Sequence, residues 1–435
     1  MSMSAYIIGG IYLYKTLRIV TNSIVSSVLS LSIYALNINI IYLQTTAMSE
    51  SLFLCTLSAA IYYFMLAIQK KDNMYLIPAG LAVSAMCLVR YEALAILVAS
   101  VVMVISYTWL QTRSYKKAES STILYTTLAC LGFAMWTIYL TIIFGDPLYW
   151  KNYYAGTPTE KLGAPIVESL SLIGAFWKYF TTVVWMNGLI PTLLALLAIP
   201  FAIYISIKQK SYYFMPVILS LAIFLFMMLT LMRNTPIDQP ALTWANLLSP
   251  DTSYFLEFNI RYGLLMLPFI TLLCSYLFIS RFIIIKLAVF SLLLIQFYSY
   301  YHPSYSVLYQ LPISVSINTT QGTPRDKALV AWLKQNYDHG LIMISALKHD
   351  PKMLQLGVNY KTFIHEGTGK YWRESRKDPQ KYATWVIFDE YNKSDQVTKY
   401  VASSKNLDLY YNLIYDEDGM KVYKIKTKPE IEIKQ

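Results

Sequence analysis

The most costly charges in this sequence lie inside apolar runs. In AMCLVRYEALAILV, residues 85–98, Arg90 and Glu92 stand two positions apart with Tyr91 between them. A guanidinium can bind a phosphate or a carboxylate through two parallel hydrogen bonds, and a carboxylate can accept a proton from a hydroxyl or an amine. Charged side chains at membrane depth are rare because they are costly, so they mark a candidate functional site.

Three other segments place charged residues where apolar runs begin or end. Glu50 opens a run in TTAMSESLF, with Ser49 before it as a predicted helix N-cap, and Asp146 follows another run in FGDPLYW. In FNIRYGLLMLP, Arg261 and Tyr262 stand at the start of a third run. For each residue alone, helix capping or anchoring at a membrane surface is an equally good interpretation. Taken together, these groups predict convergence on one cavity.

The composition indicates which elements must position these groups. The 435 residues are 56% hydrophobic and 14% charged, with a mean hydropathy of +0.42, which is typical of a membrane protein. An apolar helix needs about 20 residues to cross a bilayer, so the run from 75 to 110 predicts two helices that meet at residues 90–92. Apolar runs of this kind predict about ten spans, near residues 5–20, 23–45, 50–69, 73–89, 92–111, 122–144, 184–206, 212–232, 261–280 and 283–301.

The connections between these spans alternate in charge. Basic residues are retained in short cytoplasmic loops, which gives the orientation of the chain. Every second connection is basic, and the link at residues 90–92 is one of the connections between them. Arg90 and Glu92 are therefore predicted to face the outer side. The net charge of +11 is chiefly an insertion signal, and it is not clustered as nucleic-acid binding requires. Every second connection is basic and contains Lys15 and Arg18; Lys70 and Lys71; Arg113, Lys116 and Lys117; Lys208 and Lys210; or Arg281 and Lys286.

Two long connections and a polar tail complete the predicted organisation. Residues 1–300 form a helical membrane bundle with long outer loops at 145–183 and 233–260, and residues 301–435 form a small extracytoplasmic α/β or α+β domain. The second half of the first loop predicts an interfacial helix anchored by four aromatic residues: Phe176, Trp177, Tyr179 and Phe180. The tail predicts a helix at 326–337, buried strands at 340–345 and 384–390, and a hairpin over 407–426 that turns at Asp418-Gly419.

The histidines give little indication of chemistry in the tail. The spacing of His302, His339, His349 and His365 matches no helical metal pair, so we expect no metal site and no cofactor. Ser345, His349 and Asp350 form a possible hydrolase triad, but no GxSxG motif supports it.

Residues 1–300 resemble the GT-C superfamily of polyprenyl-phosphate-sugar-dependent glycosyltransferases. The branch with protein O-mannosyltransferases and the lipid A aminoarabinose transferase is the most similar. The resemblance rests on MSESLF, LVRYEALAIL, FGDPLYW and NIRYGLLMLPF, in this order. The tail resembles the accessory α/β domain of some members, from KALVAWLKQN through ATWVIFDE to KVYKIK.

The resemblance implies transfer of a sugar from a polyprenyl phosphate to a lipid, glycan or protein acceptor, with inversion, at the outer face of a prokaryotic cytoplasmic membrane. Arg90 and Arg261 would neutralise the phosphate, and Glu50 and Glu92 would orient the acceptor or act as base. Tyr91, Asp146 and Tyr262 are the other expected substrate contacts.

Aligned with this family, span 5–20 corresponds to the second span, so the principal catalytic acid is expected before Met1 and the chain alone is expected to have little activity. The alternatives are a transporter or lipid-linked oligosaccharide flippase, and a non-catalytic membrane subunit. Transporters favour broken helices with polar residues at mid-membrane, whereas the charges here lie at the ends of spans.

Overall fold

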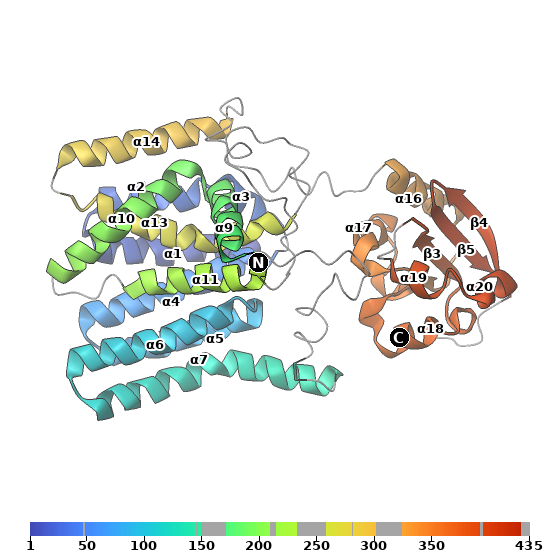
Figure 1. Ribbon diagram of the computed structural model, residues 1–435, viewed down its shortest axis with the longest axis horizontal. Coiled ribbons are helices and arrows are strands. Elements are labelled where there is room, and N and C mark those ends of the chain that lie inside the picture. The colour runs from blue at the N-terminus through green and yellow to red at the C-terminus, as the bar shows by residue number, and fades with distance from the viewer. Residues whose placement is uncertain are drawn as a thin grey trace. The chain divides into compact units, whose positions relative to one another are not determined.

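The computed structural model describes residues 1–46, 48–144, 147–148, 171–208, 215–232, 258–280, 282–301, 324–391 and 395–427. These residues form two compact units, one made of helices and one made of a sheet with helices on its faces (Figure 1). The predicted loops at 145–183 and 233–260 lie largely outside the described residues.

The helical unit is built from apolar helices joined by short connections. Its first part contains α1 (Ser2–Thr21), α2 (Ile24–Ala35), α3 (Ile38–Leu43), α4 (Glu50–Lys70), η1 (Asn73–Tyr75), α5 (Leu76–Val89), α6 (Ala93–Thr112) and α7 (Tyr115–Phe144). Its second part contains α9 (Leu172–Asn187), α10 (Leu189–Lys208), α11 (Met215–Met232), η4 (Phe258–Met266), α13 (Leu267–Leu277) and α14 (Ile283–Tyr301).

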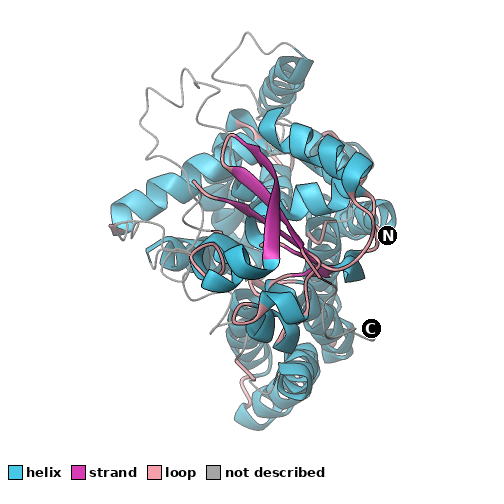
Figure 2. Cartoon of the chain, turned by 90° about the vertical axis from the view of Figure 1, so that its right-hand side faces the viewer, coloured by secondary structure: helices cyan, strands magenta, loops and turns pink. Residues whose placement is uncertain are grey.

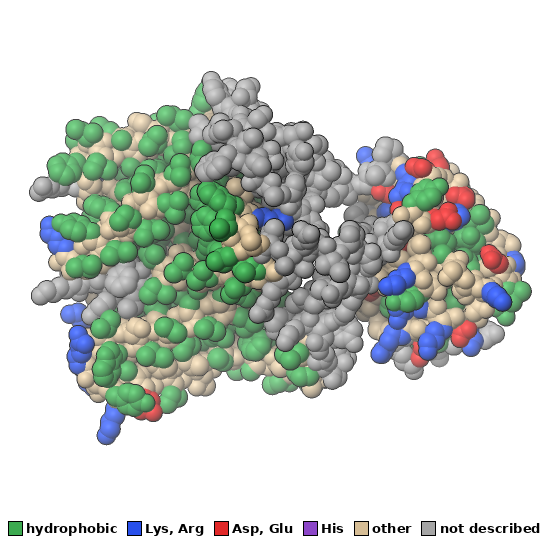
Figure 3. Space-filling view, viewed as in Figure 1, with side chains coloured by type: hydrophobic (Ala, Val, Ile, Leu, Met, Phe, Trp, Pro, Cys, Tyr) green, Lys and Arg blue, Asp and Glu red, His purple; other side chains and the backbone are tan. Residues whose placement is uncertain are grey.

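The predicted membrane architecture is confirmed in its coarse form. Among the described residues, 5 helices are long and apolar enough to cross a bilayer: Glu50–Lys70, Ala93–Thr112, Tyr115–Ile142, Leu189–Lys208 and Ile283–Tyr300. Shorter apolar helices cover Ile24–Ala35, Asn73–Val89, Val217–Met232 and Arg261–Leu277, so the number of about ten spans stays a prediction. On the face that Figure 3 shows, apolar side chains are spread over the described surface of this unit, and basic side chains gather at the end where α6 joins α7.

Two predicted spans are wrong, because each is divided between two helices. The run 23–45 is not one helix, because α2 ends at Ala35 and Asn37 starts α3, where its side chain accepts hydrogen bonds from the amides of Asn39 and Ile40. The predicted span 184–206 begins inside α9, which ends at Asn187. Gly188, with φ of 90°, follows before α10 starts. Hydropathy alone does not detect either break.

The second unit contains a five-stranded sheet in the order β2-β1-β3-β5-β4 (Figure 2). β1 (Ile342–Met343) pairs in parallel with β2 (Phe363–Ile364) and with β3 (Trp385–Asp389), and β5 (Met420–Ile425) pairs antiparallel with β3 and with β4 (Tyr411–Glu417). The prediction of a small α/β or α+β fold in the tail is therefore confirmed, whereas its extracytoplasmic location stays a prediction. The hairpin prediction is wrong for residues 407–410, which belong to the helix α20 (Lys405–Tyr410), whereas the turn at Asp418-Gly419 is as predicted.

Alternate residues of the buried strands supply two separate cores. Ile342, Trp385 and Ile387 face α16 (Pro324–Asn336) and α17 (Ala346–Leu356). On the opposite face, Val386 and Phe388 pack with residues of α18 (Lys370–Ser375), α19 (Gln396–Tyr400) and α20. Helices therefore cover both faces of the sheet, and the carboxyl ends of β1, β2 and β3 share one edge.

Candidate functional site

The link between α5 and α6 presents the first charged pair. α5 ends at Val89, and Arg90 adopts an extended conformation with φ of −153° and ψ of 148°. The Arg90 amide still donates to the Met86 carbonyl, which ends the helix, and Glu92 stands directly before α6. The prediction of two short helices that meet at residues 90–92 is confirmed.

Arg90 joins two carboxylates from different parts of the chain. Its Nη1 lies 2.6 Å from Oε1 of Glu50, and its Nη2 lies 2.7 Å from Oε1 of Glu92. Its Nε also donates to Oε2 of Glu92 at 3.2 Å, so the contact with Glu92 is bidentate. Nη1 donates further to the Ser49 hydroxyl at 3.3 Å. These bonds use four of the five N–H groups of a guanidinium.

Ser49 does not act as the predicted cap. It occupies the N-cap position of α4, but its hydroxyl makes no bond to the helix backbone, and it accepts from Arg90 instead. The carboxylate of Glu50, the first residue of α4, still benefits from the partial positive charge of the helix N-terminus.

Arg261 approaches the same carboxylate from η4. Its Nε lies 3.1 Å from Oε1 of Glu50. The guanidinium carbons of Arg90 and Arg261 lie 5.0 Å and 5.9 Å from the ring centroid of Tyr262, within cation–π distance. The structure thus brings Glu50, Arg90, Glu92, Arg261 and Tyr262 into direct contact with one another, and we call these five residues the charged cluster. That they line one outer cavity stays a prediction.

The charged cluster is largely removed from water. The side chains of Glu50 and Arg90 are 1% and 8% exposed, and those of Glu92 and Arg261 are 12% and 18% exposed. Two cations and two anions cancel within the cluster, and this pairing offsets the cost of burying each charge. Oε2 of Glu50 is buried without a hydrogen-bond partner among the described residues, so one carboxylate oxygen is left to accept a further proton or hydrogen bond.

Two predicted site residues, Tyr91 and Asp146, remain to be placed. Tyr91 stacks in a tilted geometry on Trp136 of α7, with ring centroids 6.4 Å apart. Asp146 lies outside the described residues.

The helix α9 departs from its predicted role. Tyr179, predicted as an anchor at the membrane surface, is fully buried, and its hydroxyl donates to the Tyr262 carbonyl at 3.3 Å. The anchoring prediction is therefore wrong for Tyr179, because this face of α9 packs against η4.

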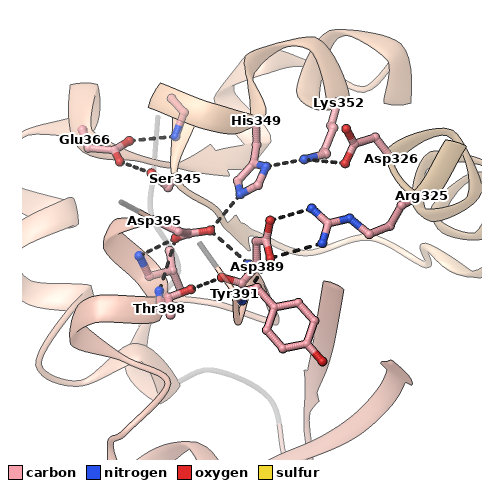
Figure 4. Close-up of polar contacts among 12 residues, drawn as sticks. Arg325, Asp326, Ser345, His349, Lys352, Glu366, Asp389, Tyr391, Asp395 and Thr398 are labelled. Carbon is pink, nitrogen blue, oxygen red and sulfur yellow. Dashed lines mark hydrogen bonds and ion pairs between the residues drawn. The ribbon is translucent and has the colours of Figure 1, made fainter. Parts of the chain in front are cut away.

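A second polar network lies in the sheet unit, near the carboxyl ends of the parallel strands (Figure 4). Oδ2 of Asp395 contacts Nε2 of His349 at 2.7 Å, and Lys352 contacts the other ring nitrogen. An ammonium only donates, so Nδ1 of His349 accepts from Lys352 and Nε2 donates to Asp395.

The hydrolase triad is not formed in this network. The Ser345 hydroxyl donates to Glu366, and His349 pairs with Asp395. Ser345 and His349 are 0% and 1% exposed, so they are closed to a substrate. The network therefore holds elements of the sheet unit together. In the part of the chain that the structure covers, no three His, Cys, Asp or Glu residues are grouped so that they could hold a metal ion.

Comparison with known families adds an independent finding. Residues 1–139 match the family model described as dolichyl-phosphate-mannose-protein mannosyltransferase. Comparisons with the curated proteins and with the solved structures find no match. The match covers α1 to α6 and most of α7, and so includes Glu50, Arg90 and Glu92 of the charged cluster. Over residues 1–139 the chain is therefore similar to the dolichyl-phosphate-mannose-protein mannosyltransferases, membrane glycosyltransferases of the GT-C superfamily.

Proposed function

We propose that this protein transfers a sugar from a polyprenyl phosphate, dolichyl or undecaprenyl, to a lipid, glycan or protein acceptor at the outer face of the membrane. One observation carries the proposal: the Glu50 carboxylate lies between the guanidiniums of Arg90 and Arg261, at the ends of apolar helices. The family match over residues 1–139 supports the same reaction class.

The two arginines have different roles in this proposal. Arg90 already donates four hydrogen bonds to Ser49, Glu50 and Glu92, so it orients the two carboxylates. Arg261 has the most exposed side chain of the four charged residues and is the group that contacts the donor phosphate. Tyr262 holds both guanidiniums by cation–π contact. Tyr91 and Asp146 remain predicted substrate contacts.

The reaction needs one bond to form and one to break. The acceptor hydroxyl or amine attacks the anomeric carbon, and the bond from this carbon to the phosphate oxygen breaks with inversion. The electron pair leaves with the phosphate, whose charge becomes more negative, and a guanidinium stabilises this developing charge. The acceptor proton passes to a carboxylate, for which Oε2 of Glu50 is the available atom among the described residues, with Glu92 as the second candidate.

The test uses the full chain in detergent, with undecaprenyl phosphate as the binding probe and undecaprenyl-phosphoryl mannose as the donor. Arg261→Ala weakens binding of the probe by about tenfold or more, as expected when a charge-assisted hydrogen bond to phosphate is lost. The wild-type chain, for which the sequence predicts little activity, sets the reference rate. Glu50→Gln binds the probe within about threefold of the wild type but releases undecaprenyl phosphate from the donor more slowly than this reference, because the proton acceptor is gone.

Arg373→Ala is the matched control, because Arg373 is an exposed arginine on α18 in the sheet unit. It leaves binding and release unchanged. Equal binding by the wild type and Arg261→Ala would contradict the proposal. Movement of the lipid-linked sugar across a bilayer with its sugar–phosphate bond intact would indicate a transporter instead, and binding without either event would indicate a non-catalytic subunit.

A further inference from the structure

The last residue of α9 connects that helix with η4. Asn187 is 1% exposed, and its Nδ2 donates to two carbonyls, that of Val183 in its own helix and that of Gly263 in η4, both at 2.8 Å. Two carbonyl acceptors require the nitrogen end of the amide, which fixes the orientation of the side chain. The Oδ1 atom of Asn187 is buried without a partner among the described residues. The contact of Asn187 with η4 therefore depends on its NH2 group.

Two further contacts hold the same stretch of η4 against α9. The Tyr179 hydroxyl donates to the Tyr262 carbonyl at 3.3 Å. At Gly263 a Cβ atom would lie 2.4 Å from the Thr182 carbonyl oxygen, so only glycine permits this approach of the two backbones. The backbone of residues 262–263 is therefore fixed by α9.

The end of α9 is itself held in place by two other asparagines. The side-chain nitrogens of Asn37 and Asn39 donate to the Met186 carbonyl at 2.9 Å and 3.3 Å, and both residues are fully buried. In an apolar interior these bonds have no water to compete with them. A rigid support thus runs from α3 through the end of α9 to η4.

We propose that Asn187 is a positioning residue that holds η4 so that Arg261 and Tyr262 reach Glu50 and Arg90. Arg261 is only two residues from Gly263, and its Nε to Glu50 distance of 3.1 Å leaves little room for a shift of the backbone. Misplacement by about 1 Å is enough to impair a reaction centre severely. The inference rests on the proposed function only for its consequence in phosphate binding.

The main test is a double-mutant cycle between Asn187→Asp and Arg261→Ala, with undecaprenyl phosphate as the probe and the full chain in detergent. Asp has nearly the shape of Asn but presents oxygen atoms to both carbonyls, so η4 is released. Asn187→Asp weakens probe binding by about tenfold in the wild-type background, equivalent to one charge-assisted hydrogen bond, and by less than about twofold in the Arg261→Ala background. Asn187→Leu, which removes the donor without adding charge, behaves in the same way.

A second readout does not depend on the donor. In Asn187→Asp, backbone amides of residues 258–266 exchange with deuterium faster, while those of α4 and α6 keep wild-type rates. Ser275→Ala is the control, because Ser275 is fully buried in α13 and its hydroxyl donates to the Leu272 carbonyl of its own helix. It changes neither readout.

The outcomes separate this inference from the proposed function. Additive losses in the cycle, or faster exchange throughout the helical unit, would overturn the positioning role. If Arg261→Ala binds the probe as well as the wild type does, the proposed function fails, and exchange in η4 still decides whether Asn187 holds that segment.

Discussion

The charges of Arg90 and Glu92 are stable in their surroundings only as a pair. Both lie mostly out of water, and the bidentate contact satisfies both carboxylate oxygens of Glu92. Removing one partner of a buried pair leaves an uncompensated charge, whereas removing both can be nearly neutral. Because removal of one partner and removal of both have different effects, the pairing of Arg90 with Glu92 can be tested by measuring stability, without an activity assay.

We predict that Arg90→Met lowers the free energy of unfolding by about 3–5 kcal/mol, because Glu92 loses its partner. In the double variant Arg90→Met/Glu92→Gln, the contact between Glu50 and Arg261 remains, and at least about 1 kcal/mol of stability returns. Denaturation of the purified protein in detergent, followed by tryptophan fluorescence, measures both values. A double variant less stable than Arg90→Met would contradict the conclusion that the unpaired charge of Glu92 causes the loss of stability.

At the level of single residues, the sequence identifies charged residues whose burial is energetically unfavourable, and it does not identify the uncharged residues that hold them in place. Charges in apolar runs need a compensating partner, and this need identifies Glu50, Arg90 and Arg261 as a group. Asn187 and Tyr179 are uncharged, and such residues occur in apolar helices for many reasons, so their contacts with η4 have no signal in the sequence. The unequal roles of the two arginines also depend on distances that spacing does not give.

At the level of elements, the sequence predicts most apolar helices but not where they break. The period and length of apolar runs locate α4, α6 and α14, whereas the break between α2 and α3 depends on one asparagine side chain. Similarly, the buried strand β3 is predicted from its apolar residues, but the helix α20 is assigned to a strand because its short run lacks a clear period.

Asp395 illustrates how one carboxylate joins elements in the sheet unit. Its Oδ2 accepts from the amide of Asp389 at 3.1 Å and from His349, and its Oδ1 accepts from the amides of Val397 and Thr398, at the start of α19. It is 0% exposed. Asp395 therefore connects the end of β3, the start of α19 and the helix α17.

We predict that Asp395→Asn destabilises the sheet unit by about 2–4 kcal/mol, because an amide turns its NH2 group toward donors that it cannot satisfy. Deuterium exchange of the β3 amides in the full chain measures the effect and shows faster exchange. Asp378→Asn is the control, because the pair of Asp378 with Lys381 is 43% and 41% exposed, and such pairs contribute at most about 1 kcal/mol. Unchanged exchange in β3 would contradict the role of Asp395.

At the level of the whole molecule, the alternation of basic connections predicts which ends of the helices face the cytoplasm. In the helical unit, basic side chains gather at the end where α6 joins α7 (Figure 3). The charged cluster lies at the start of α4 and at the α5–α6 link, one helix length from the α6–α7 connection. The positive-inside rule therefore assigns the charged cluster to the outer side.

The predicted orientation of the helical unit also predicts the side of the membrane on which the sheet unit lies. We expect Ser403→Cys, at an exposed position of that unit, to react with a membrane-impermeant maleimide in intact cells, because the sequence predicts an extracytoplasmic location for its domain. Lys117→Cys, exposed at the start of α7, reacts only after the cells are permeabilised, because translocation of a basic loop is disfavoured. The wild-type chain is the control for its own four cysteines, which are buried or half-buried in apolar helices. Labelling of position 117 and protection of position 403 in intact cells would invert the topology and would place the charged cluster on the cytoplasmic side, where the proposed reaction does not occur.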